Sequence, residues 1–190
     1  MAASLRSADG LKREALNLTM TRFVAFLRGV TPMNVKMPEL KGCFDAAGFT
    51  NVRTILSSGN VAFDARASSE ASLERAAEQA MQQGLGRSFY TIVRPSTYLA
   101  ELLASDPYVT CGIPSHAKRV ISFLREARAP RIELPLARDQ ASVFCLLGRE
   151  AFTAYLPTDK GPVFMRLIEL AFGTDVTTRT WDTVAKCAAA

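Results

Sequence analysis

The order of apolar segments in the first half of the chain most strongly constrains what it can fold into. Short apolar runs typical of buried strands alternate with two segments whose apolar residues recur at helical spacing. In chain order, strands are expected at 22–29, 51–57, 60–65 and 88–95, and helices at 37–48 and 69–84. Strand, helix, strand, strand, helix, strand is the order of a ferredoxin-like plait, in which two helices cover one face of an antiparallel sheet. The sequence therefore predicts this fold for residues 20–104, with a linking helix at its end.

The second half is less regular and predicts a smaller α+β domain. Residues 105–116 contain two prolines and a glycine, a composition typical of a domain boundary, so we expect a linker there. Residues 117–190 predict three strands and two helices. The proline-containing segment 129–140 is expected to be an extended loop, and 176–180 a short strand or extended segment before the last helix. The predicted fold class of the chain is α+β.

The first nineteen residues are expected to lie outside both domains. Residues 1–19 contain Arg and Lys but lack the apolar core of a secretory signal. An amphipathic, transit-like leader is the alternative, and the folded part is predicted to begin near Met20. No window of about 18 apolar residues occurs, so the sequence predicts no membrane span.

The basic residues permit an anionic partner but do not form one continuous surface in the sequence. Lys and Arg number 23 against 18 Asp and Glu, which gives a net charge of +5 and a pI near 9.2. Such a balance is compatible with a nucleic-acid or phosphate partner. The longest clusters are Lys118-Arg119 and the run of Arg125, Arg128 and Arg131, which glutamates dilute. This pattern favours a solvated surface over a nucleic-acid-binding stripe.

The four cysteines indicate a reducing compartment. Cys43, Cys111, Cys145 and Cys187 have neither the spacing of a zinc site nor that of a redox motif. Cys43 and Cys145 lie in apolar stretches and are expected to be buried thiols. This cysteine usage predicts a cytoplasmic protein.

The sequence contains no pattern that indicates catalysis or a cofactor. His116 is the single histidine, so a hydrolytic triad would depend on it, with Ser115 or Cys111 as nucleophile. Neighbours in sequence rarely have triad geometry, and the nucleophile-elbow and phosphate-loop motifs are absent. Carboxylates such as Asp64 and Glu70 show no paired spacing for acid–base work. We therefore expect no cofactor, no metal and no autonomous enzyme.

Nucleic-acid binding through the first sheet is an alternative with weak support. A ferredoxin-like sheet is also the scaffold of RNA-recognition motifs, which stack bases on aromatic residues of the two central strands. Phe23, Phe26 and Phe63 lie in the corresponding strands here. The basic-glycine-aromatic signature of those domains is missing, and phenylalanines in strands usually belong to the core.

Three polar segments, 28–36, 57–60 and 177–181, are the candidates for a ligand site. Their candidate ligand-binding residues are Arg28, Ser58, Asn60, Thr177, Thr178, Arg179 and Trp181. For the stretch "SSGN" a tight hairpin turn is favoured over a ligand site, since glycine supplies a positive φ and asparagine tolerates one.

The segment "TTRTWDTV" also allows two interpretations. Thr178 or Thr180 can cap the last helix, and this role is favoured. In the alternative, Arg179 joins the free N–H groups at the helix start to bind an anion, with Trp181 beside it.

Two blocks of the sequence resemble one bacterial family. The block "FVAFLRGV…VKMPELK…GFTNVRTILSSGNVAF" and the block "FGTDVTTRTWDTV" are together similar to the family catalogued as domain of unknown function 1697, over about Met20 to Cys187. The resemblance implies a ferredoxin-like first domain and a smaller α+β second domain, and it carries no established activity. The chain departs from the common pattern at two places. "RGVTPM" (28–33) stands where many members have "RGINVGG", and Val163-Phe164 stands where they often have Ser-Lys.

These observations favour a non-enzymatic module that binds an anionic ligand such as phosphate, a nucleotide or a nucleic-acid backbone. The alternative is an enzyme of unknown class, in which the polar residues of the three segments converge on a cleft.

Overall fold

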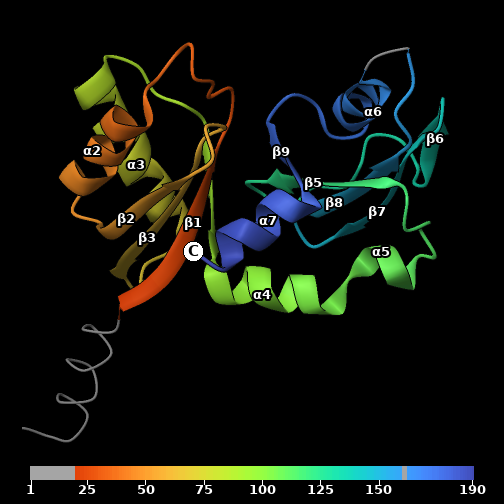
Figure 1. Cartoon of the computed structure of the whole chain (residues 1–190), viewed down its shortest axis with the longest axis horizontal. Helices are drawn as coiled ribbons and strands as arrows, with labels where there is room; N and C mark the ends of the chain where they lie inside the picture. The colour runs from red at the N-terminus through yellow and green to blue at the C-terminus, as the bar shows by residue number, and fades with distance from the viewer. Residues whose placement is uncertain (1–19, 160–161) are drawn as a thin grey trace, which may run out of the picture.

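The computed structural model describes residues 20–159 and 162–190, so the predicted leader 1–19 lies outside the described residues. Two antiparallel sheets form the framework, and helices cover both of them (Figure 1). The α+β class is confirmed. None of the helices in the described ranges is long and apolar enough to cross a membrane.

The first sheet has the strand order of a ferredoxin-like plait. Its elements are β1 (Met20–Leu27), α2 (Met37–Ala46), β2 (Thr50–Ile55), β3 (Asn60–Arg66), α3 (Glu70–Leu85) and β4 (Thr91–Pro95). The strands lie in the order β2-β3-β1-β4, and every adjacent pair is antiparallel. Helices α2 and α3 lie side by side on one face of this sheet (Figure 1).

Strand β1 is buried on both of its faces, which explains its continuous apolar run. Side chains alternate along a strand. Phe23, Ala25 and Leu27 therefore pack with the helices α2 and α3, while Val24 and Phe26 face the opposite side. All five are 4% exposed or less.

The second half contains two more strands than the sequence predicts. Its elements are α4 (Ser96–Ser105), α5 (Pro107–Thr110), β5 (Lys118–Leu124), β6 (Leu136–Arg138), β7 (Ala141–Leu147), β8 (Glu150–Tyr155), α6 (Val163–Phe172), β9 (Val176–Thr180) and α7 (Trp181–Ala188). The sheet order is β6-β7-β8-β5-β9, with β6 and β9 at the edges.

Both additional strands are short edge strands. β6 lies in the segment expected to be an extended loop, and β9 is the segment 176–180 expected to be a short strand or extended segment. β6 follows Pro135 and has only three residues, so no apolar alternation can develop in it. It pairs with β7 through a turn at Asp139 and Gln140, both of which have positive φ angles. β9 is rich in threonine and pairs only with β5, which leaves one of its edges open.

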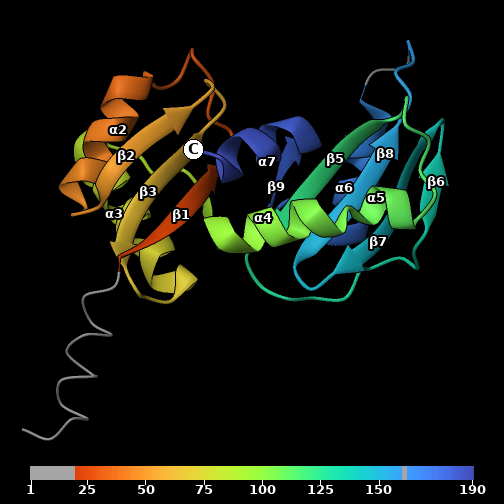
Figure 2. The ribbon, with the colours of Figure 1, turned by 60° about the horizontal axis from the view of Figure 1, so that its bottom comes forward.

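Helix α7 lies between the two sheets, and α4 packs beside it as it runs from the first sheet toward the second half (Figures 1 and 2). The apolar core there takes residues from both halves, including Val24 and Phe26 of the first sheet and Phe123 and Phe152 of the second. The rings of Phe26 and Phe123 stack, with centroids 4.3 Å apart. The two halves are therefore connected by a shared apolar core as well as by the chain segment 105–116. The role of this segment as a domain boundary stays a prediction.

A network of charged side chains also joins the two halves. Arg94 of β4 is fully buried, and its guanidinium donates to Glu150 of β8 at 2.8 Å and to the carbonyl oxygen of Leu124 at 2.6 Å. Glu70 at the start of α3 accepts from Arg94 at 3.2 Å and from Arg149 at 2.6 Å. Arg94 is thus paired with carboxylates on both sides of the junction.

Helix α3 contributes two more carboxylates to this junction. Glu74 accepts from the N–H of Val93 at 3.0 Å, and both Glu74 and Glu78 form ion pairs with Arg125, which follows β5. Burial raises the pKa of Glu74 although these partners oppose the shift. The spacing of Glu70, Glu74 and Glu78 places all three on one face of α3, toward the second half.

We predict that Arg94→Ala strongly destabilises the fold. Removing this guanidinium leaves the nearly inaccessible Glu150 carboxylate without its cation. Breaking a buried ion pair from one side costs about 3–5 kcal/mol. Urea unfolding followed by circular dichroism measures the loss.

Lys41→Ala serves as the matched control for that measurement. It breaks an exposed ion pair with Asp45 on α2 and should change the free energy of unfolding by less than about 1 kcal/mol. If Arg94→Ala lost no more than this control, the network would not stabilise the junction.

Candidate functional site

Arg179 of β9 is the candidate residue with the most contacts. Its Nε donates to the side-chain oxygen of Asn60, and one terminal nitrogen donates to its neighbour's carbonyl oxygen, that of Thr178, at 2.8 Å. The other terminal nitrogen lies 2.8 Å from the carbonyl oxygen of Leu27 and 2.9 Å and 3.2 Å from those of Ser58 and Gly59. We call Arg179, Asn60 and these three carbonyl groups the Arg179 clamp. It ties β9 to the end of β1 and to the "SSGN" turn.

The "SSGN" stretch is the turn of the β2–β3 hairpin. Gly59 has φ +74°, and a Cβ atom added there would lie 2.7 Å from the Cβ of Val30. Asn60 is fully buried, and its amide nitrogen donates to the carbonyl oxygen of Ile55 at 2.9 Å and to the Ser58 hydroxyl at 3.1 Å. The asparagine therefore closes the turn with one end of its amide and contacts Arg179 with the other.

The guanidinium of Arg179 has no carboxylate partner in the described part of the chain. The atoms that accept hydrogen bonds from Arg179 are neutral oxygen atoms. The salt bridges found among the described residues do not include Arg179. Burial lowers the pKa of Arg179 to about 10. The side chain therefore remains positively charged at neutral pH and its charge is not neutralised.

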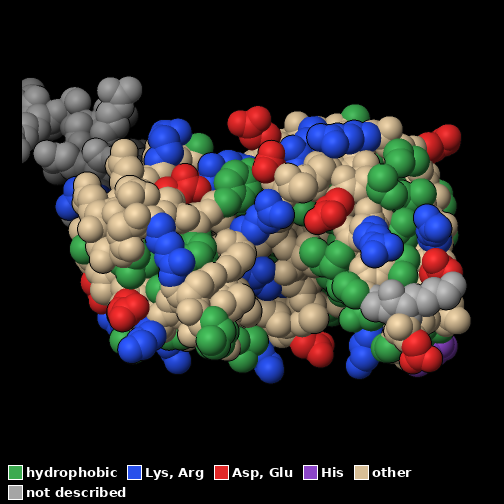
Figure 3. Space-filling view, turned by 90° about the horizontal axis from the view of Figure 1, so that it is seen from above, with side chains coloured by type: hydrophobic (Ala, Val, Ile, Leu, Met, Phe, Trp, Pro, Cys, Tyr) green, Lys and Arg blue, Asp and Glu red, His purple; other side chains and the backbone are tan. Residues whose placement is uncertain are grey.

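A groove of about 370 Å³ runs beside β9. Its lining residues are Arg28, Gly29, Val120, Tyr155, Phe164, Met165, Val176, Thr177, Thr178, Arg179 and Thr180. They come from the loop after β1, from three strands of the second sheet and from the start of α6. None of these lining residues is acidic, and two are arginines. Figure 3 views the face that carries α6 and the loop after β1, where Lys and Arg side chains are visible near the middle.

The three threonines of this groove differ in their hydrogen bonds. The Thr178 hydroxyl is 2.8 Å from the Ser122 hydroxyl. Thr180 caps α7 by accepting from the N–H of Thr183. The Thr177 hydroxyl is buried and lacks a hydrogen-bond partner among the described residues. One polar group in the groove wall is therefore unsatisfied.

The start of α7 is occupied by groups of the protein itself. Thr180 satisfies an N–H group of the first turn, and the Asp182 carboxylate complements the helix dipole. Trp181 packs edge-on against Tyr108, with ring centroids 5.0 Å apart, and lines a different cavity. The structure thus brings Arg28, Thr177, Thr178 and Arg179 to one groove but does not bring Arg179 to the helix start beside Trp181.

Ser58 and Asn60 are connected to this groove only through the clamp. They do not line it, since their polar atoms face Arg179 and the turn. The alternative of an enzyme requires a cleft to which polar residues of all three segments contribute. Segment 57–60 contributes none of the residues that line the groove, so this convergence is incomplete.

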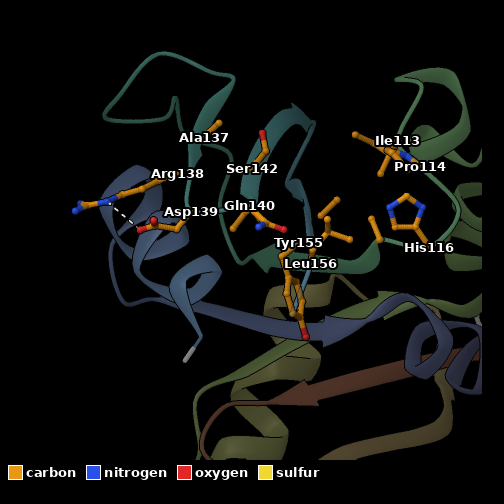
Figure 4. A pocket seen from close by; sticks show the side chains of 13 residues that line it. Ile113, Pro114, His116, Ala137, Arg138, Asp139, Gln140, Ser142, Tyr155 and Leu156 are labelled. Atoms are coloured by element: carbon orange, nitrogen blue, oxygen red, sulfur yellow. Dashed lines mark ion pairs between the residues drawn. The ribbon is translucent and has the colours of Figure 1, made fainter. Parts of the chain in front are cut away.

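Two larger cavities flank the groove. One, of about 630 Å³, has a mainly apolar wall from the loop 113–117 and strands β6 to β8 (Figure 4). The other, of about 750 Å³, is lined by Lys118, Arg119, Trp181 and Asp182 among others. The exposed His116 lines both of them, and Tyr155 lines both and the groove as well. Across the described ranges, no three His, Cys, Asp or Glu side chains are grouped to hold a metal ion.

Several residues of the site and of the junction cannot be recognised from the sequence. Tyr155 and Phe164 form part of the groove wall, with their rings stacked at a centroid distance of 4.3 Å. An isolated aromatic residue in a strand or helix gives no sequence signal for such a position. The acidic face of α3, in contrast, could have been found from the repeat of Glu at every fourth position.

The fold and the groove define a two-sheet α+β protein. Its halves are joined by the buried Arg94 and by partly buried arginines, and its groove is lined by two arginines and no acidic residue. Over residues 20–152 the sequence matches the family described as protein of unknown function (DUF1697), and the chain belongs to this family. The predicted membership is confirmed.

Among solved structures, the chain is similar to the conserved bacterial protein SP0830 from Streptococcus pneumoniae. The TM-score is 0.66 with 18% sequence identity, over 90% of this chain and 98% of that one. At this identity the likeness concerns the fold. A comparison with curated proteins gave no match.

We predict that Gly59→Ala destabilises the protein by at least about 2 kcal/mol, because the new Cβ meets Val30 and the positive φ is strained for alanine. Gly42→Ala, inside α2 with open space around the glycine, should instead stabilise by about 0.5–1 kcal/mol. Chemical denaturation of both variants tests this pair. Equal effects would show that the turn is not sterically fixed.

Proposed function

We propose that the groove beside β9 binds an anionic ligand, of which inorganic phosphate is the simplest example. We further propose that the protein is a binding module without catalytic activity of its own. The observation that carries the proposal is the charge of the groove: its lining contains Arg28 and Arg179 and no acidic residue.

The two arginines have different roles in this proposal. All three nitrogen atoms of Arg179 already donate within the protein, so Arg179 contributes a fixed positive charge. Arg28 is exposed and can move to meet a ligand. A unit charge about 4 Å from an anion contributes about 4 kcal/mol at an effective dielectric constant of 20, before the desolvation cost. A pair of arginines can therefore support weak binding of a simple anion.

The ligand class extends to nucleotides and nucleic-acid backbones. The groove adjoins the cavity of Lys118 and Arg119, since Tyr155 and Thr180 line both. An extended anion bound at Arg28 could reach this second basic region. Asp182, in the same cavity, opposes an anion there.

We also propose a bacterial, cytoplasmic protein. Each of the four cysteines is a free thiol in the structure, which is typical of a reducing compartment. The structural neighbour is a bacterial protein.

The first test compares phosphate binding by the wild type and Arg28→Ala. We expect millimolar binding by the wild type, and at least a tenfold loss on removal of Arg28, because a charged hydrogen bond contributes about 1.5–3 kcal/mol. Isothermal titration calorimetry measures both. Arg66→Ala, which removes an exposed arginine of β3 away from the groove, should bind like the wild type. Equal affinity of Arg28→Ala and the wild type, or no binding by either, contradicts the proposal.

The second test adds a cation to the groove. Phe164 lines it at the start of α6, where the family pattern often has lysine. We predict that Phe164→Lys tightens phosphate binding by about threefold to tenfold, an effect that decreases with added salt. Leu170→Lys places the same charge on an exposed position of the same helix, outside the groove. A similar gain in both variants would indicate an effect of net charge and not of the groove.

A further inference from the structure

The groove beside β9 adjoins the cavity at the start of α7 along a common wall. Tyr155 and Thr180 line both of them. The register of the second sheet explains this shared wall. Lys118, the first residue of β5, pairs with Tyr155, the last residue of β8. Further along β5, Val120 pairs with Thr180, the last residue of β9. The ends of three strands therefore meet here, and one molecule can lie across them.

The two ends of this combined space differ in their chemistry. The groove contains Arg28 and Arg179 and no acidic residue, whereas the cavity contains both Lys118 and Asp182. Neither Lys118 nor Asp182 forms an ion pair with a residue that the structure describes. A carboxylate repels a second anion but accepts hydrogen bonds from neutral N–H and O–H groups. The cavity therefore suits a neutral group that carries donors, next to the anion in the groove.

An aromatic ring forms part of the same cavity. Trp181 is partly exposed and lines the cavity together with Tyr155. Tyr108 and Phe152 pack edge-on against Trp181, with ring centroids 5.0 Å and 6.3 Å from that of the indole. The core behind the indole therefore holds it in place. Proteins commonly bind nucleobases by stacking them on aromatic side chains of this kind.

We propose that the ligand of the groove is a nucleoside monophosphate, with its phosphate at Arg28 and its base and sugar in the cavity of Trp181 and Asp182. The phosphate occupies the anion site of the proposed function, on which the assignment of a nucleotide therefore rests. The base contacts the Trp181 indole, and its N–H groups donate to the Asp182 carboxylate. Guanine suits this cavity, because its edge offers neighbouring N–H donors to Asp182 and a carbonyl acceptor to Lys118.

The dimensions of the two spaces agree with a ligand of this size. Arg179 lines the groove and Asp182 lines the cavity. They are so close in sequence that their Cα atoms lie within about 11 Å of each other. The groove of about 370 Å³ and the cavity of about 750 Å³ are both within the usual range of small-molecule sites, about 300–1,000 Å³. A bare phosphate reaches only one of them, and a longer polyanion brings negative charge to Asp182. A nucleotide avoids both mismatches.

The first test compares guanosine monophosphate with inorganic phosphate by isothermal titration calorimetry on the full chain. The wild type should bind the nucleotide at least about tenfold more tightly, since the base adds stacking and charge-assisted hydrogen bonds. The fluorescence of Trp181, the single tryptophan, should change with the nucleotide and not with phosphate. If phosphate binds and the nucleotide binds no more tightly, the nucleotide assignment is overturned and the anion site of the proposed function stands. If neither binds, both are overturned.

The second test uses Asp182→Ala to separate a bound base from a general effect of charge. The variant should bind guanosine monophosphate at least about tenfold more weakly than the wild type, because the base loses its acceptor. It should bind tripolyphosphate equally or more tightly, because a repulsive charge is removed, and this binding also shows that the variant is folded. Glu101→Ala removes an exposed carboxylate of α4 outside both spaces and should bind the nucleotide like the wild type. Equal or tighter nucleotide binding by Asp182→Ala overturns the assignment.

Discussion

The second apolar face of the first sheet is the constraint on which the rest of the structure depends. Helices α2 and α3 cover one face of this sheet, yet Val24, Phe26 and Ile92 on the other face are fully buried as well. That face needs a cover, and α4, α7 and Phe123 of the second sheet supply it. The second half therefore completes the core of the first. The same constraint explains why β1 is continuously apolar and does not show the alternation of a half-exposed strand.

Buried charge at the same junction fixes how the two halves meet. An arginine taken out of water stabilises a structure only where hydrogen bonds and opposite charges replace its hydration. Arg94 has both, from Glu150, Glu70 and the Leu124 carbonyl oxygen. These partners lie on the second sheet and on α3, whereas Arg94 belongs to the first sheet, so its guanidinium joins the two halves. Apolar packing and the charged network therefore meet at the same junction.

The sequence predicts local structure well and its long-range connections poorly. The plait follows from apolar periodicity and turn residues, both of which are properties of neighbouring residues. Edge strands such as 136–138 are too short for a period, and their pairing depends on a partner elsewhere in the chain. The same reason applies to the site. Arg28 and Arg179 were found as candidates because they lie beside turns and helix ends, but their common groove, and the bonds from Arg179 to the "SSGN" turn, appear only in the fold.

The Arg179 clamp and the groove beside it have different roles. The segments "SSGN" and "TTRT" form the clamp, which uses the donors of Arg179 to hold the halves together. The segments 28–33 and 163–164 each contribute to the groove wall, through Arg28 and Phe164. The clamp therefore ties β9 to the first half through contacts within the protein itself. In the proposed function, the ligand meets Arg28 and Phe164 in the groove wall beside the fixed charge of Arg179.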